Sequence, residues 1–241
     1  NGVTVYGLYA GPAYYNQNGG IAGYTSGALF PKIDTSTAVF KNISIKNSYF
    51  TGYNSAALFA DTTLSNGSAV IENIVVANCY INSTHTGNSG GVIGGFCSNN
   101  GGSNVSDKVL INNCLVYGNE VVNASGAAAR LIGTMEAWHY DGSGKVHSAE
   151  HFSIKNTVAI GCAIENTGSW WQKNSSLFAN CYTTEANAAE NTTITKLSGF
   201  NDAIGNSALL NLKNLDKSVW FFNTSTYPQL RVFHDIKSKT N

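Results

Sequence analysis

The sequence predicts an all-β domain, a right-handed parallel β-helix (solenoid) with three strands per coil, long loop insertions and a C-terminal cap. The first observation behind this prediction is an internal repeat, in which an apolar residue, a polar residue and Asn precede an alternation of apolar and polar residues. The copies cover residues 40–45, 71–76, 111–116 and 154–159. The second observation is that these segments are short, rich in β-branched residues and bounded by Gly, Asn, Ser and Thr, which is typical of strands.

The elements follow from the N-terminus. Residues 1–25 are expected to form an N-terminal coil or cap, and residues 26–182 the repeat coils. A second phrase, of small residues leading into a bulky pair, occurs at 26–30, 55–59, 90–94, 129–133 and 175–178. A third apolar run occurs at 47–50, 78–81, 118–122 and 161–164. Three short strands cannot enclose a core alone, but stacked coils bury a continuous one.

The C-terminal part, residues 183–241, is expected to form the last coil and the cap, so that 1–241 is a single domain. A short helix is predicted within 203–215. The intervals between copies of the first phrase vary, which places insertions in loops at about 98–107, 134–150 and 165–175. Because insertions on one face of a solenoid commonly build its binding surface, function is expected there.

Asparagines recur at one position of the first phrase. Asn42, Asn73, Asn113 and Asn156 occupy the same place in successive copies. Stacked amides can hydrogen-bond along a β-ladder, so these side chains are predicted to serve folding rather than binding.

Five cysteines are scattered through the apolar runs and show neither a CxxC pair nor a His at zinc-finger spacing. They are interpreted as buried thiols that act as small hydrophobes, with a single disulfide as the alternative for an exported protein. They are Cys79, Cys97, Cys114, Cys162 and Cys181.

Charge is scarce in this chain. The 14 Lys+Arg balance 14 Asp+Glu, so charged residues make up 12% of the chain, where about 25% is usual. The zero net charge and the pI of about 7.1 argue against a nucleic acid or an anionic membrane as partner. No apolar run reaches the roughly 20 residues of a membrane helix, and a monomer is expected. The N-terminus begins at Asn1 without a signal-peptide segment, so an excised mature module is expected.

The acidic residues are dispersed, which argues against a glycosidase, since that chemistry needs two facing carboxylates. One insertion does gather titratable residues, namely Glu136, His139, Asp141, His147, Glu150 and His151. A polysaccharide lyase or glycoside hydrolase that uses Arg130, Glu136, His139 and Asp141 is therefore kept as an alternative function. No metal site is predicted, and a structural calcium ion is the one cofactor left open.

Aromatic residues in two insertions suggest sugar binding. An aromatic ring offers a sugar a flat apolar platform, while nearby amides, carboxylates and hydroxyls bond its hydroxyl groups. The predicted carbohydrate-binding residues are Glu136, Trp138, His139, Tyr140 and Asp141 in the first insertion and Trp170, Trp171 and Gln172 in the second.

Two resemblances extend these expectations. The Gly-Gly-x-x-Gly phrase at 19–23 and 90–94, followed by the Ile-x-Asn alternation, resembles the GLUG-type repeats of bacterial surface proteins over roughly 19–182. The Trp strand and Tyr-Pro turn within 219–231 are similar to the capping tail that follows such repeats. This resemblance implies a protein-binding surface adhesin, the second alternative function.

In architecture and composition the chain also resembles the β-helical xylan-binding modules that accompany xylanases in gut-bacterial proteins. That resemblance implies a non-catalytic carbohydrate-binding module for a neutral, xylan-like plant polysaccharide. It also implies a covalently linked, xylanase-like catalytic domain and a secreted or cell-surface location in a bacterium. Such a module holds its enzyme near the substrate and raises the effective concentration.

Overall fold

The chain folds as an all-β protein, as predicted: strands account for 52% and helices for 11% of the structure. The computed structural model describes residues 2–11, 27–84, 91–99, 108–124, 126, 128–136, 139–141, 144–146, 152–164, 177–185 and 193–237. The strands are β1 (Val3–Tyr6), β2 (Tyr9–Ala10), β3 (Phe30–Lys46), β4 (Tyr49–Gly52), β5 (Phe59–Ala77), β6 (Tyr80–Ser83), β7 (Gly91–Asn99), β8 (Lys108–Asn112), β9 (Leu115–Tyr117), β10 (Glu120–Asn123), β11 (Arg130–Glu136), β12 (His139–Asp141), β13 (Gly144–Val146), β14 (Phe152–Lys155), β15 (Val158–Ala159), β16 (Phe178–Ala179), β17 (Cys181–Thr183), β18 (Ile194–Lys196), β19 (Trp220–Phe221) and β20 (Gln229–Leu230). The helices are the 3-10 helix η2 (Phe200–Ala203), α2 (Gly205–Asn211) and α3 (Arg231–Lys237).

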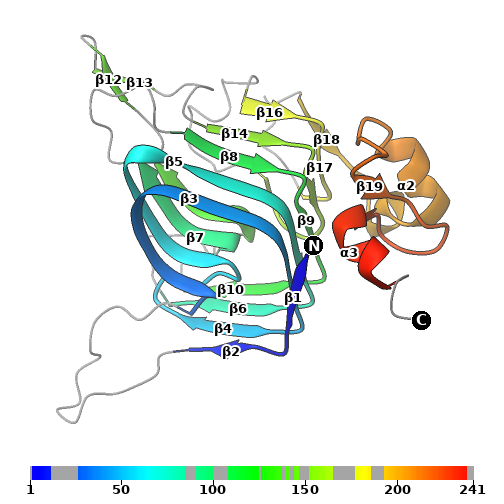
Figure 1. The fold of residues 1–241 in the computed structure, drawn as a ribbon. Coiled ribbons are helices and arrows are strands. Elements are labelled where there is room, and N and C mark those ends of the chain that lie inside the picture. The colour runs from blue at the N-terminus through cyan, green and yellow to red at the C-terminus, as the bar shows by residue number, and fades with distance from the viewer. Residues whose placement is uncertain are drawn as a thin grey trace.

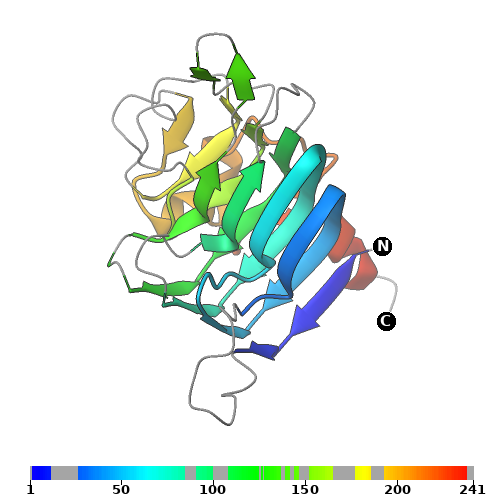
Figure 2. The same cartoon turned by 90° about the vertical axis from the view of Figure 1, so that its left-hand side faces the viewer.

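Strands from successive repeats pair in parallel and in register, and four ladders result (Figures 1 and 2). The first ladder joins Phe30, Phe59, Gly94 and Ile132. The second joins the parts of β3 and β5 around Phe40 and Ile71 to β8, β14 and β16. The third joins β1 and the last residues of β3 and β5 to β9, β15, β17 and β18. The fourth is the sheet β2-β4-β6-β10.

The main core lies between these ladders. In the third ladder Ile45, Val76, Val116 and Ala159 share one column, and each is fully buried. They pack with inward residues of the other ladders, such as Phe50. Because side chains alternate across a strand, the column next to it, which contains Val75 and Leu115, faces the opposite side.

Two corners in each repeat need a left-handed backbone. The first is always Asn, with φ of 50–60° at Asn42, Asn73, Asn113, Asn156 and Asn180. The second is Asn or Gly, at Gly7, Asn47, Asn78, Gly118 and Gly161. Asn and Gly are the residues that adopt this conformation at least cost, so the recurring Asn of the sequence marks the bend between the second and third ladders.

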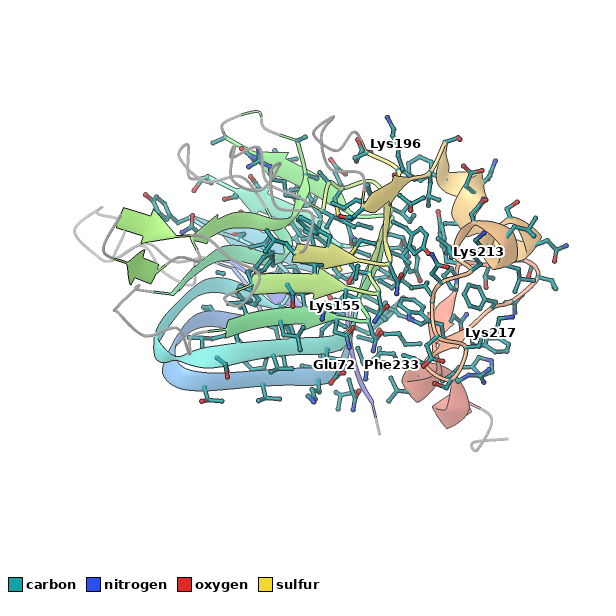
Figure 3. The ribbon with its side chains drawn as sticks, turned by 90° about the horizontal axis from the view of Figure 1, so that it is seen from above. Glu72, Lys155, Lys196, Lys213, Lys217 and Phe233 are labelled. Carbon is teal, nitrogen blue, oxygen red and sulfur yellow. The ribbon has the colours of Figure 1, made fainter. Side chains whose placement is uncertain are left out.

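The predicted amide ladder is present in part: Asn42 and Asn73 bond to each other, but Asn113 does not link Asn73 to Asn156. Asn73 Nδ2 donates to Asn42 Oδ1 at 2.8 Å, and Asn180 Nδ2 donates to Asn156 Oδ1 at 2.9 Å. Asn156, however, donates to Asn112 Oδ1 rather than to Asn113. Asn112 in turn donates to Glu72, which pairs with Lys41 at 2.8 Å. The row therefore consists of hydrogen-bonded amides and one ion pair. Figure 3 shows Glu72 and Lys155 projecting from strands of the second ladder.

The later repeats differ from the predicted strand pattern. Phe178 pairs with Ile154 in the second ladder, so the segment 178–183 is a fifth copy of the first phrase. Ala163 forms a bridge with Arg130 on β11, so the run 161–164 joins β11 and not the fourth ladder. Apolar alternation indicates a strand but does not specify its partner, which explains both differences.

The C-terminal segment covers the outer face of the third ladder (Figure 1). Leu115, Val158 and Tyr182 from the ladder form a second buried cluster with Leu212 and Trp220 of the cap. The predicted helix within 203–215 is confirmed as α2. Trp220, on β19, is fully buried and anchors this layer.

Candidate functional site

The residues predicted to bind sugar lie mostly outside the described part of the chain. The backbone at Glu136 ends β11, and His139, Tyr140 and Asp141 form β12, which pairs antiparallel with β13. This hairpin projects from the ladders on the side away from the cap (Figure 1). The side chains of these four residues are not described, and Trp138, Trp170, Trp171 and Gln172 lie wholly outside the described residues, as do His147, Glu150 and His151.

The positions of Arg130 and Glu136 on β11 argue against the alternative catalytic function. Arg130 and Glu136 lie at opposite ends of this strand, which at roughly 3.3 Å per residue separates their Cα atoms by about 20 Å. Arg130 is half-buried, and its guanidinium donates to the carbonyl oxygen of Gly133. Burial lowers the pKa of Arg130 from its usual value. Arg130 and Glu136 are therefore poorly placed to act on one sugar bond.

Among the described residues, the fourth ladder carries an aromatic row. Tyr9, Tyr49 and Tyr80 occupy equivalent positions on β2, β4 and β6. The ring centroids of Tyr9 and Tyr49 are 5.1 Å apart with an interplanar angle of 8°, and those of Tyr49 and Tyr80 are 4.8 Å apart at 10°. We call these three residues the tyrosine row.

The row faces outward because the residues that alternate with it face the core. Phe50 and Ile81 are fully buried, whereas Tyr9 is 70% and Tyr49 36% exposed. The third ring, Tyr80, is partly exposed. Strand alternation therefore turns the hydrophobic core inward and leaves an aromatic strip along the outside of the sheet.

Polar side chains border the tyrosine row. Thr51 and Asn82 pair with each other two residues beyond Tyr49 and Tyr80, which places them on the same face. Glu120 follows Tyr80 in the column and is exposed. The face thus combines aromatic rings with a hydroxyl, an amide and one carboxylate, which suits an uncharged ligand rich in hydroxyl groups.

Sequence reasoning missed this row, although a signal was present. Tyr49 and Tyr80 each follow, by two positions, the Asn that forms the second corner of its repeat. Tyr9 follows Gly7 in the same way. Aligning the repeats on that corner places the three tyrosines in one column.

Several described carboxylates have local structural partners. Glu72 pairs with Lys41, and the hydrogen bond from Lys41 lowers the pKa of Glu72 against the opposing effect of burial. Asp202 accepts from the backbone of Ser198, and Asp216 from that of Ser218. Within the described ranges, no group of three or more His, Cys, Asp or Glu residues is arranged to hold a metal ion.

The four cysteines whose side chains are described are buried free thiols, as predicted. Burial raises the pKa of Cys114 and Cys181 to about 12 and also raises the pKa of Cys79 and Cys162. These thiols are therefore not nucleophiles at neutral pH.

Comparison of the chain with protein-family models, with curated proteins and with solved structures finds no match. Of the helices that the structure describes, none is long and apolar enough to cross a bilayer.

Proposed function

We propose that the protein is a non-catalytic carbohydrate-binding module for a neutral, xylan-like plant polysaccharide. The observation that carries the proposal is the exposed tyrosine row with Thr51 and Asn82 beside it. Because the three rings stack against one another, the strip presents ring edges and phenol hydroxyls to sugar rings, and the bordering groups accept and donate hydrogen bonds. Because the strip crosses three strands, it suits an extended chain better than a single sugar.

The loop insertions belong to the same proposal. Trp138, His139 and Tyr140 with Glu136 and Asp141, and Trp170, Trp171 and Gln172, supply the second contact region predicted from the sequence. A module of this kind is secreted or held at the cell surface of a bacterium and is linked to a xylanase-like catalytic domain. It acts by keeping that enzyme at its substrate.

The scaffold of this module is, in our proposal, a right-handed parallel β-helix with GLUG-type repeats. Four parallel ladders in register and a left-handed Asn corner in every copy of the first phrase support it. Each chain segment between one Asn corner and the next is then one coil.

The test is a screen of soluble and insoluble polysaccharides by affinity electrophoresis, with release of reducing sugar and absorbance at 235 nm as readouts of cleavage. Retarded migration without product is expected. Product would identify a lyase or hydrolase and overturn the proposal. Neither retardation nor product would also overturn it and would favour the surface adhesin.

Variants locate the binding surface. Replacement of Tyr49 and Tyr80 together by Ala is expected to weaken polysaccharide binding about tenfold or more, the loss typical of central aromatic contacts. Tyr6→Ala is the matched control, because Tyr6 is as exposed as Tyr9 but lies in the third ladder. Equal effects of the control and the double variant would remove the tyrosine row from the proposal.

A second set tests the insertions. Trp138→Ala and the double variant Trp170→Ala/Trp171→Ala are each expected to reduce affinity. If both retain full affinity, sugar binding does not involve the insertions. The tyrosine row is judged separately by its own variants.

A further inference from the structure

A cleft of about 390 Å³ separates the outer face of the third ladder from the C-terminal cap. Ser44, Val75, Leu115 and Tyr117 line it on the ladder side, and Tyr227 and Phe233 on the cap side. In Figure 3 Phe233 lies where α3 faces the strands. The volume of the cleft lies within the range of about 300–1,000 Å³ that is typical of small-molecule sites.

The cleft lies where one column of the ladder changes from large side chains to a small one. Ser44, Val75, Leu115, Val158 and Tyr182 follow one another in this column. The large side chains of its later members pack against the cap in the second cluster. At Ser44 the column no longer fills the space to the cap.

The Ser44 hydroxyl is the polar group at this end. Its side chain is 1% exposed, and its oxygen has no hydrogen-bond partner. A buried hydroxyl without a partner costs free energy relative to water. A ligand that supplies a hydrogen bond there recovers this cost on binding.

The remaining lining combines aromatic and apolar side chains with Ser225, Thr226 and Gln229 of the cap and with one positive charge. The rings of Tyr117 and Tyr227 lie 4.7 Å apart, tilted by 36°, and burial raises the pKa of both phenols, which keeps them neutral. Lys46 also lines the cleft and follows Ser44 by two residues on the same face of β3.

We propose that this cleft binds a one-ring aromatic carboxylate that carries a hydroxyl group, a ligand of the hydroxybenzoate class. The ring packs among Leu115, Tyr117 and Phe233. The hydroxyl bonds to Ser44 Oγ, and the carboxylate lies toward the Lys46 ammonium. This site is distinct from the tyrosine row and does not depend on the polysaccharide-binding proposal.

The probe is 4-hydroxybenzoate, followed by saturation-transfer-difference NMR and by calorimetry on the full chain. We expect a Kd on the order of 10⁻⁴ M, a realistic value for a ligand with about ten heavy atoms. Phenol, which lacks only the carboxylate, and 4-hydroxycyclohexanecarboxylate, which lacks only the aromatic ring, are expected to bind at least severalfold more weakly. Equal binding of all three compounds would overturn the assigned ligand class.

Substitutions at Ser44 give the sharpest test. Ser44→Ala removes the hydroxyl and is expected to weaken 4-hydroxybenzoate binding about five- to tenfold. Ser44→Leu also fills the cleft and is expected to abolish binding while extending the apolar column of Val75 and Leu115. Thr4→Ala is the matched control, because Thr4 is exposed and pairs with Ser44 in the same column.

The outcomes separate clearly. Absence of saturation transfer to the wild-type protein, or unchanged affinity in a folded Ser44→Leu variant, would overturn the proposal. Polysaccharide retardation should be the same in Ser44→Leu and wild type. A failed cleft therefore leaves the tyrosine row untouched, and a failed tyrosine row leaves the cleft untouched.

Discussion

The side-chain amide of Asn73 donates a hydrogen bond to Oδ1 of Asn42, 2.8 Å away in the preceding repeat, and both residues have positive φ. One residue type therefore performs two tasks. It turns the chain between two strands without the steric cost that other side chains incur, and it bonds neighbouring repeats to each other. This explains why Asn recurs at the corner, where Gly would satisfy the backbone alone.

Asn156 allows the two tasks to be separated. Its amide donates to Asn112 and accepts from Asn180, each at 2.9 Å, and its φ is 50°. Asn156→Gly keeps the backbone freedom and should lower the free energy of unfolding by about 1–2 kcal/mol through lost hydrogen bonds. Asn156→Ala should lower it by about 1 kcal/mol more, because Ala is strained at positive φ.

Urea denaturation at pH 7 measures both changes. Asn206→Ala is the control, since Asn206 is exposed on α2, and a change within about 0.5 kcal/mol is expected there. Equal losses for the Gly and Ala variants would show that the corner conformation does not contribute.

The Lys41–Glu72 pair predicts a pH-dependent contribution. The Lys41 hydrogen bond holds the pKa of Glu72 below its usual value, so the carboxylate stabilises the fold above the unfolded pKa of about 4.3. Glu72→Gln can retain the bond from Asn112 and should cost about 0.5 kcal/mol at pH 7, since the pair is partly exposed.

The deficit of Glu72→Gln should disappear as the pH falls through the folded pKa of Glu72. Chemical denaturation of both proteins at pH 7 and pH 3 tests this sign. A double-mutant cycle with Lys41→Met assigns the effect to the pair. A deficit that persists unchanged at pH 3 contradicts the assignment.

The buried thiols predict a clear labelling pattern. Because burial raises the pKa of Cys114 and Cys181 to about 12, almost no thiolate is present at pH 8. These two cysteines, and the buried Cys79 and Cys162, should resist iodoacetamide in the native protein and react after unfolding. Peptide mass spectrometry after isotope-coded alkylation measures each site. Native labelling of Cys114 at the rate of free cysteine would contradict the described core.

Two glycines of the small-residue phrase predict different responses to Ala. A Cβ at Gly94 would overlap the ring of Phe59, whereas a Cβ at Gly91 would overlap backbone atoms of Gly94 and Gly133. Gly94→Ala should lower stability by about 1–3 kcal/mol, and Gly91→Ala by about 3 kcal/mol or more. Phe59→Leu should partly restore the stability of Gly94→Ala but not that of Gly91→Ala, because backbone atoms cannot move aside as a side chain can.

Thermal or urea unfolding of the single and double variants tests this pair. Phe59→Leu alone supplies the baseline, since it leaves a cavity of its own. If Phe59→Leu restored the stability of Gly91→Ala to the same extent, its effect would come from looser packing of the whole core and not from relief of the contact with Gly94.

The repeating phrases were sufficient to predict an all-β fold, because alternation and corner residues are local properties of the chain. They also identified the asparagines that recur at one position of each copy, although not that these residues form left-handed corners. They did not predict that Asn156 bonds to Asn112 instead of Asn113, since adjacent amides are equivalent in a sequence pattern. Nor did they identify 178–183 as a further copy, because its Phe178 also completes the small-residue phrase at 175–178.

The candidate sites were harder to predict. Trp138 and Trp170 stand out in the sequence because they are aromatic residues within polar insertions. Tyr49 and Tyr80 stand inside strand phrases, and only the register between repeats makes them neighbours. The cleft at Ser44 depends on how far the cap reaches along the ladder, which is a property of packing that periodicity does not contain.

Because each copy of the first phrase has the same Asn corner, the number of copies sets the length of this protein. A duplicate of residues 43–73 inserted after Asn73 would present the same Asn at its end and the same pairing edge to the next repeat. The ladders would then lengthen by one strand spacing, about 4.8 Å, and the aromatic strip would gain a ring. Evolution or an engineer can thus set the reach of the binding surface by adding or removing whole units.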